Sequence, residues 1–208
     1  MSASAFIHSY AAAHADLARV LPEGDVKVAT LGPDGTTATE VVQLLSQNLA
    51  SMTPPRNLQL CLHSDFDSVL SCLLAGDADV AFVPSASKGA TLFHWHSDLR
   101  LLFHFAAPTP SYGVAVRRGD DLPARGVPSV AVMPEVRAVL NDLWDGLGRP
   151  RPHVVEARST RDAGDQLVQG HVDAALTNEP TRERLGLDWI TARPGVQVVW
   201  MVFARNPT

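Results

Sequence analysis

Val26-Lys27-Val28-Ala29-Thr30-Leu31-Gly32-Pro33-Asp34-Gly35-Thr36-Thr37 is the stretch of the chain that decides the fold. An apolar run leads into two glycines and a proline, and apolar residues at helical spacing follow. This order predicts a strand, a tight turn and a helix that begins with hydroxyl groups and free backbone N–H groups. A helix start of this kind binds anions. The apolar positions of the helix are Val41, Val42, Leu44, Leu45 and Leu49.

The same alternation of strand and helix continues along the chain. Ser64 is the predicted N-cap of the second helix, Gly76 its predicted end, and Pro134 introduces a later helix. Alternation of this kind predicts an α/β protein with mostly parallel sheets covered by helices on both faces. The expected strands are 58–62, 80–83, 99–106, 112–116, 130–133, 153–157, 174–176 and 196–203, and the later expected helices are 136–144, 160–169 and 179–185.

Two positions are predicted to carry the chain between two lobes. One is Pro108-Thr109-Pro110, and the other lies near Thr177. Lobe 1 is then expected at about 24–107 plus 178–208, lobe 2 at about 108–177, and an amphipathic helix at 1–23. A cleft between two such lobes is a common place for a small-molecule site.

Composition and charge argue against several classes of ligand. The 208 residues carry a net charge of −5 with no basic face, so no nucleic-acid partner is expected. No run of about 18 apolar residues and no signal-peptide pattern is present, so we expect a cytoplasmic protein that does not bind membranes. Cys61 and Cys72 are interpreted as small buried side chains. His94 and His96 have no third ligand at a sensible spacing, so no metal is expected.

Several segments resemble prephenate dehydratase domains in their order along the chain. Leu31–Thr36 is similar to the Gly-Pro-Glu-Gly-Thr opening of that family, and Gly76–Pro84 to its strand that ends in Val-Pro. Ser159-Thr160 at a helix start and Ala175–Thr177 before Gly186-Leu187 continue the series. The resemblance spans about 26–205 and implies the two-lobe fold of type 2 periplasmic binding proteins.

Two departures from the dehydratase pattern bear on the reaction. Ser85–Gly89 stands where dehydratases carry Ile-Glu-Asn-Ser after Val-Pro. Val198-Val199-Trp200 stands where they carry Thr-Arg-Phe, whose threonine is thought to help protonate the leaving hydroxyl. An apolar pair supplies neither a proton nor a clamp for a carboxylate, so we expect the aromatising dehydration to be crippled.

The chain resembles more closely the non-aromatising prephenate decarboxylases of bacilysin-type antibiotic biosynthesis. Asp98–Phe103, Thr109–Val116 and Ala175–Glu179 carry this resemblance. It implies that prephenate loses carbon dioxide and keeps its ring hydroxyl, giving a dihydro-4-hydroxyphenylpyruvate. No cofactor is expected, because the diene of the substrate accepts the electron pair. The resemblance also implies a homodimer, and no appended regulatory domain is expected.

The candidate site residues are hydroxyls, amides and backbone groups at helix starts. The first group is expected to hold one carboxylate and consists of Gly35, Thr36 and Thr37, for which plain helix capping is the alternative. The remaining candidates are Ser85 and Ser87 facing the cleft, and Ser159 and Thr160 for the pyruvyl arm. Arg161 is a counter-ion or a solvated surface arginine, and Thr177 and Asn178 line the cleft or satisfy hinge backbone groups at the crossover. Glu179 and Tyr112 are proton donors or structural residues. Ser85, Ser87, Thr160 and Glu179 are expected to act in catalysis and the others in substrate binding.

Two other functions stay open at this stage. One is an ordinary prephenate dehydratase that forms phenylpyruvate. The other is a small-anion binding module, because solute receptors and regulator domains share the fold. Receptors normally carry a signal peptide and regulators a helix-turn-helix, and neither pattern is evident, so the sequence favours an enzyme.

Overall fold

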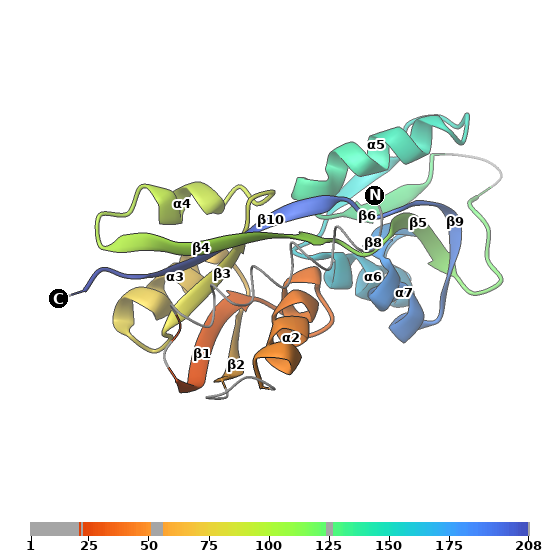
Figure 1. The fold of residues 1–208 in the computed structure, drawn as a ribbon. Coiled ribbons are helices and arrows are strands. Elements are labelled where there is room, and N and C mark those ends of the chain that lie inside the picture. The colour runs from red at the N-terminus through yellow and green to blue at the C-terminus, as the bar shows by residue number, and fades with distance from the viewer. Residues whose placement is uncertain (1–20, 22, 51–55, 124–126, 208) are drawn as a thin grey trace. The chain divides into compact units, whose positions relative to one another are not determined.

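The computed structural model describes residues 21, 23–50, 56–123 and 127–207. The chain forms two compact units, the first ending at Pro108 and resuming at Gln197, the second comprising Thr109–Val196 (Figure 1). The helix predicted for 1–23 falls almost wholly outside the described residues. In the described part of the chain, no helix is long and apolar enough to cross a membrane.

Unit 1 is a five-stranded sheet with helices on both faces (Figure 1). Strands β1 to β3 run parallel, and β10 lies antiparallel to both β3 and β4. Helix α2 packs on one face through Val41, Val42 and Leu45, while α3 and α4 pack on the other. The sheet order is β2 (Arg56–His63), β1 (Gly24–Leu31), β3 (Val80–Pro84), β10 (Gln197–Arg205) and β4 (Leu99–Pro108), and the helices are α2 (Thr37–Ala50), α3 (Phe66–Ala75) and α4 (Ala90–His94).

Unit 2 repeats this arrangement of strands. Its sheet has three parallel strands, β7, β6 and β8, followed by β5, which is antiparallel to both β8 and β9. Helix α5 covers one face and α6 the other, and Leu185 of α7 packs beside α6. The elements are β5 (Tyr112–Arg117), β6 (Ser129–Val132), a 3₁₀ turn (Pro134–Val136), α5 (Arg137–Asp145), β7 (His153–Glu156), α6 (Thr160–Val168), β8 (Ala174–Asn178), α7 (Glu179–Leu185) and β9 (Leu187–Arg193).

A missed strand explains where the predicted lobe boundary is wrong. The sequence pattern predicts no strand over Leu187–Arg193 and a return of the chain to the first lobe near Thr177. In the structure β9 pairs with β5, so residues 178–196 stay in unit 2 and the return comes at Gln197. The sheets are also mixed, not mostly parallel, because β10 and β5 each run against their neighbours.

Two local predictions are corrected in unit 1. The N-cap of α3 is Asp65 and not Ser64, since the Asp65 carboxylate accepts the Ser68 N–H at 2.8 Å and the Ser64 hydroxyl donates to Asp65. Hydrogen bonds from Ser68 and Ser64 hold the pKa of Asp65 below its ordinary value. His94 ends the unforeseen helix α4, where its ring lies edge-on to Phe203.

Asp173 couples the stability of unit 2 to pH. Its carboxylate accepts the N–H and the hydroxyl of Ser129 at 2.7 and 2.8 Å, and these bonds lower the pKa of Asp173 below 3.8. A lowered folded pKa adds stability above the unfolded pKa, and this is lost as the pH falls through the folded pKa. We expect Asp173→Asn to cost about 1 kcal/mol at neutral pH. In urea unfolding, the difference from wild type should shrink below pH 3.8, and a constant difference would contradict the assignment.

Candidate functional site

The turn before α2 brings one group of predicted residues to the carboxyl edge of the unit 1 sheet. Gly35 has a φ of +84°, a left-handed conformation that favours glycine, and its N–H donates to the Thr39 hydroxyl at 3.0 Å. That hydroxyl donates to the Thr36 carbonyl at 2.9 Å, which closes the turn. Thr36 is buried and its own hydroxyl makes a long 3.4 Å bond to the Leu31 carbonyl. Thr37 is the first residue of α2.

The turn after β3 reaches the same edge of the sheet. The Ser85 N–H donates to the Val199 carbonyl at 2.8 Å, which joins the turn to the start of β10, and the Ser85 side chain is exposed. The Ser87 hydroxyl accepts the Gly89 N–H at 3.1 Å. A Cβ on Gly89 would lie 2.6 Å from the Phe66 ring, so the turn packs closely on α3. Ser85 is thus the more accessible of the two predicted serines.

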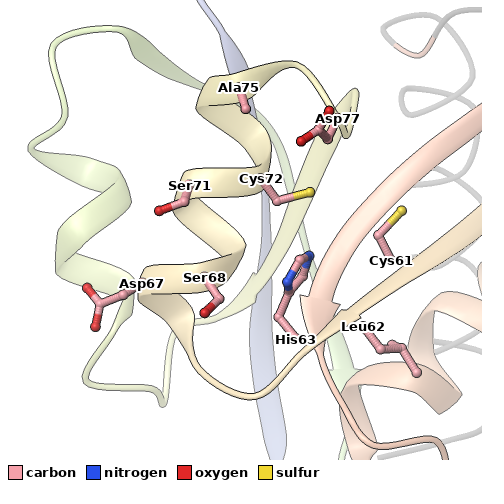
Figure 2. Close-up of a pocket in the computed structure, with 9 residues that line it drawn as sticks. All are labelled: Cys61, Leu62, His63, Asp67, Ser68, Ser71, Cys72, Ala75 and Asp77. Atoms are coloured by element: carbon pink, nitrogen blue, oxygen red, sulfur yellow. The ribbon is translucent and has the colours of Figure 1, made fainter.

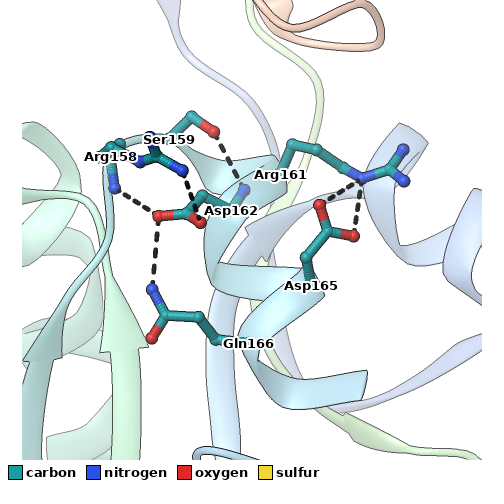
Figure 3. Close-up of polar contacts among 6 residues, drawn as sticks. All are labelled: Arg158, Ser159, Arg161, Asp162, Asp165 and Gln166. Carbon is teal, nitrogen blue, oxygen red and sulfur yellow. Dashed lines mark hydrogen bonds and ion pairs between the residues drawn. The ribbon is translucent and has the colours of Figure 1, made fainter. Parts of the chain in front are cut away.

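The start of α6 forms a capped turn in unit 2 (Figure 3). The Ser159 hydroxyl oxygen accepts the Asp162 N–H at 3.0 Å, and the Asp162 carboxylate accepts the Arg158 N–H at 2.8 Å. Capping therefore uses the oxygen of Ser159 as an acceptor, while its proton remains a donor. The Asp162 carboxylate also places a negative charge at the positive end of the helix. An anion at this helix start would therefore meet hydroxyl donors beside a carboxylate, and not an uncapped helix end.

The end of β8 is tied to the start of α6. The fully buried Thr177 hydroxyl donates to the Thr160 carbonyl at 2.8 Å, so the predicted residues Ser159, Thr160, Thr177 and Asn178 are brought together. Asn178 caps α7, with its side-chain oxygen accepting the Thr181 N–H at 3.1 Å. Its Nδ2 group is buried without a hydrogen-bond partner, and so is the Thr181 hydroxyl. Buried polar groups are normally hydrogen-bonded, so these two donors are candidates for a hydrogen bond to a ligand oxygen.

The charged candidates of unit 2 are partly engaged. Both Asp165 oxygens accept from Arg161 Nε, at 3.0 and 3.1 Å, so its Nη groups lie outside this pair (Figure 3). The Glu179 carboxylate is 46% exposed and lies 4.0 Å from the Arg182 guanidinium. Tyr112 pairs with Asn178 in the β5–β8 ladder. Tyr112 and Glu179 therefore flank Asn178 along the chain and across the sheet.

A pocket of about 660 Å³ opens between β2 and α3, on the α3 side of unit 1 (Figure 2). Cys61, Cys72 and His63 line it together with the carboxylates of Asp67 and Asp77. Burial raises the pKa of the Cys72 thiol, with nearby Cys61 as a smaller cause. Two carboxylates without a neighbouring lysine or arginine in the lining repel an anionic ligand. No group of three or more metal-ligating side chains in the described residues is arranged to hold a metal ion.

Comparison with known proteins assigns the chain to a family. No family model matches it. A prephenate decarboxylase of Planktothrix agardhii is 30% identical over 192 residues, covering 90% of this chain and 93% of the relative. The chain belongs to the prephenate decarboxylase family. A prephenate decarboxylase of Bacillus subtilis is 27% identical over 181 residues, covering 87% of both chains.

Solved structures confirm the predicted fold class. The prephenate dehydratase of Arthrobacter aurescens, solved with L-Phe, has a TM-score of 0.64 at 20% identity. The match covers 88% of the present chain but only 61% of the dehydratase chain. The present chain therefore spans less than two thirds of the length of that dehydratase. The periplasmic VFT2 domain of Bordetella pertussis BvgS and a putative methionine-binding lipoprotein of Bacillus subtilis share the fold, each with a TM-score of 0.54, at 17% and 10% identity.

Two candidate residues of this family member were missed from the sequence. Thr181 and Trp200 each bury a polar atom without a hydrogen-bond partner. Thr181 lies three residues after the helix N-cap Asn178. This spacing predicts that the Thr181 N–H is capped, but it does not predict that the Thr181 hydroxyl lacks a hydrogen-bond partner. Trp200 follows the apolar pair Val198-Val199 in the sequence, and no role is predicted for it. The spacing of these residues contains no sign that their polar atoms lack partners.

Proposed function

We propose that this protein decarboxylates prephenate without aromatising the ring, in the biosynthesis of a natural product. The C–C bond to the ring carboxylate breaks and carbon dioxide leaves. The electron pair enters the ring diene, which shifts, and a ring carbon takes up one proton. The hydroxyl is retained, and the product is a dihydro-4-hydroxyphenylpyruvate. Membership of the prephenate decarboxylase family is the observation that carries this proposal.

The start of β10 supports retention of the hydroxyl. Dehydration needs an acid at the departing oxygen. Val198 and Val199 stand at the positions where dehydratases carry threonine and arginine. Val198 is buried in the apolar cluster under α2, and Val199 is 40% exposed. Neither side chain carries a proton to donate. The electron pair from decarboxylation is then quenched at carbon.

Both units offer donors of the kind that a dianionic substrate needs. In unit 1 the start of α2 at Thr36 and Thr37, together with Ser85 and Ser87, is proposed to bind through hydroxyl and backbone groups. Fixed donors of this kind in a water-poor site stabilise the charge that develops during reaction. Loss of water around the departing carboxylate favours its release.

The predicted residues of unit 2 are proposed as substrate-binding and catalytic groups in the same way. Ser159, Thr160, Thr177 and Asn178 are assigned to substrate oxygens, and Arg161 to a carboxylate through its Nη groups. Glu179 is proposed as the acid that protonates the ring carbon, with Tyr112 as the second candidate. The partial exposure of Glu179 supports this role, since the acid must exchange protons with solvent between turnovers.

Incubation with prephenate alone tests the proposal. Purified protein would be mixed with prephenate without added metal or cofactor, beside an enzyme-free control. Released carbon dioxide, ultraviolet absorbance and the proton NMR spectrum of the product would be followed. We expect carbon dioxide and a product that keeps the ring hydroxyl signal. Phenylpyruvate as the main product would mean a dehydratase, and unchanged prephenate with folded protein would favour the binding module.

A further inference from the structure

Trp200 places an indole at the carboxyl edge of the unit 1 sheet. It pairs with Pro84, the last residue of β3, and the chain leaves the sheet at Ser85 directly after this pair. The indole packs in the apolar cluster on the face that α2 covers, and its side chain is 2% exposed. In open α/β sheets, ligands bind outside the carboxyl ends of the parallel strands. The backbone of Trp200 therefore lies at the edge of the sheet where ligands of such folds bind, while its indole lies inside the apolar cluster.

The indole N–H of Trp200 is buried and has no hydrogen-bond partner. Thr30, a fully buried polar residue of β1, donates to the Phe82 carbonyl at 2.9 Å and so is satisfied. Trp144 in unit 2 shows the ordinary arrangement, since its buried indole N–H donates to the Pro150 carbonyl at 2.9 Å. A buried donor without an acceptor is unfavourable, and phenylalanine at position 200 would occupy apolar surroundings without that cost. The unpaired N–H of Trp200 therefore points to a partner that comes from outside the chain.

We propose that the indole N–H of Trp200 donates a hydrogen bond to a substrate oxygen. The N–H is shielded from bulk water, so the ligand must displace the side chains that cover it. The bond then forms in a water-poor environment, where hydrogen bonds are stronger. Trp200 is then a substrate-binding residue, although the apolar residues around it in the sequence give no sign of this role.

The chemistry of decarboxylation selects which oxygen the N–H binds. This step rests on the proposed function. A donor to the departing carboxylate would stabilise the ground state more than the transition state, because negative charge leaves that group. A donor to the 2-oxo acid arm has no such disadvantage, since that arm keeps its charge throughout. The ring hydroxyl is uncharged and accepts a weaker hydrogen bond than a carboxylate, so the N–H of Trp200 is assigned to the 2-oxo acid arm of prephenate.

The chain offers a matched pair of variants for the test. Trp200→Phe removes the idle N–H, and Trp144→Phe removes a bonded one from a similarly buried indole. Affinity for prephenate and for phenylpyruvate, which carries only the 2-oxo acid arm, would be measured by calorimetry, with urea unfolding alongside. We expect Trp200→Phe to weaken both affinities about 10- to 100-fold, the value of a hydrogen bond to a charged group. Trp144→Phe should leave both affinities unchanged and lower stability more.

The indole N–H resonance gives a readout that a packing role would not move. In protein labelled with nitrogen-15 tryptophan, the Trp200 signal is identified by its absence from Trp200→Phe. Ligand should shift this signal downfield and leave that of Trp144 in place. Unaltered affinity in Trp200→Phe, or a Trp200 signal that stays fixed while ligand binds, would overturn the proposal. If wild type binds phenylpyruvate through Trp200 but does not convert prephenate, the proposed function fails and the Trp200 contact stands. Absence of any signal shift with either ligand overturns the contact itself.

Discussion

Asn178→Asp is expected to lower kcat/KM for prephenate about 100-fold or more while leaving the protein folded. The aspartate keeps an oxygen to accept the Thr181 N–H, so the cap of α7 is preserved, and a negative charge suits a helix start. The change replaces the buried, unpartnered Nδ2 donor by an oxygen. An anionic substrate then loses a donor and meets a like charge, which costs several kcal/mol.

Steady-state kinetics with urea unfolding measures the effect of Asn178→Asp. Asn141→Asp is the matched control, because it makes the same change of charge at an exposed position of α5 in the same unit. The control should retain wild-type kinetics. Near-normal kcat/KM in a folded Asn178→Asp variant would show that Nδ2 is an idle group of the core and not a substrate donor.

Gly195→Ala is expected to destabilise the protein by about 3 kcal/mol or more. A Cβ at this position would lie 1.8 Å from the Thr109 carbonyl oxygen and 2.7 Å from that of Pro110. Neither contact can be relieved by a side-chain rotation, because both atoms belong to the backbone. The Thr109 N–H donates to the Val196 carbonyl at 2.8 Å, so the two connections between the units are held together at this point. Alanine must separate them.

Urea unfolding followed by circular dichroism tests the Gly195 prediction. Gly146→Ala is the matched control, since Gly146 has a right-handed φ of −65° and the nearest atom to its Cβ would be the Leu143 carbonyl oxygen at 3.4 Å. We expect its stability to stay within about 1 kcal/mol of wild type. Equal midpoints for Gly195→Ala and wild type would mean that the two connections do not approach this closely.

The elements that the sequence predicted well are those with strong local signals. Val80–Val83 is a continuous apolar run, and it forms the buried strand β3. Gly76 was expected to end α3, and it does so with a φ of +85°. Ser159 was expected at a helix start, and it caps α6. Each prediction depended on a few neighbouring residues, so tertiary contacts had little to change.

The missed elements depend on partners distant in sequence. Leu187–Arg193 has β-forming residues at Trp189, Ile190 and Thr191, but only pairing with β5 makes it a strand of unit 2. The lobe boundary depended on that pairing and was misplaced with it. The candidate site is also only partly predictable. The sequence shows which helices begin with hydroxyl-bearing residues, but it does not show which of these hydroxyls already form hydrogen bonds. Thr177 was one candidate among several until its bond to the Thr160 carbonyl joined β8 to α6.

The sequence alone determined the strand–turn–helix order, the hydroxyl-rich helix starts and the resemblance to a family. Apolar periodicity, turn residues and caps act over a few residues, which is why a pattern can predict them. The tertiary structure decided the strand order of each sheet and the unit to which β9 belongs. It also decided which buried polar atoms of the described residues have partners, and the Asn178 amide and the Trp200 indole are among those that have none. Hydrogen-bond satisfaction is a property of the whole packed unit, because the acceptor for a buried donor can come from any part of the chain.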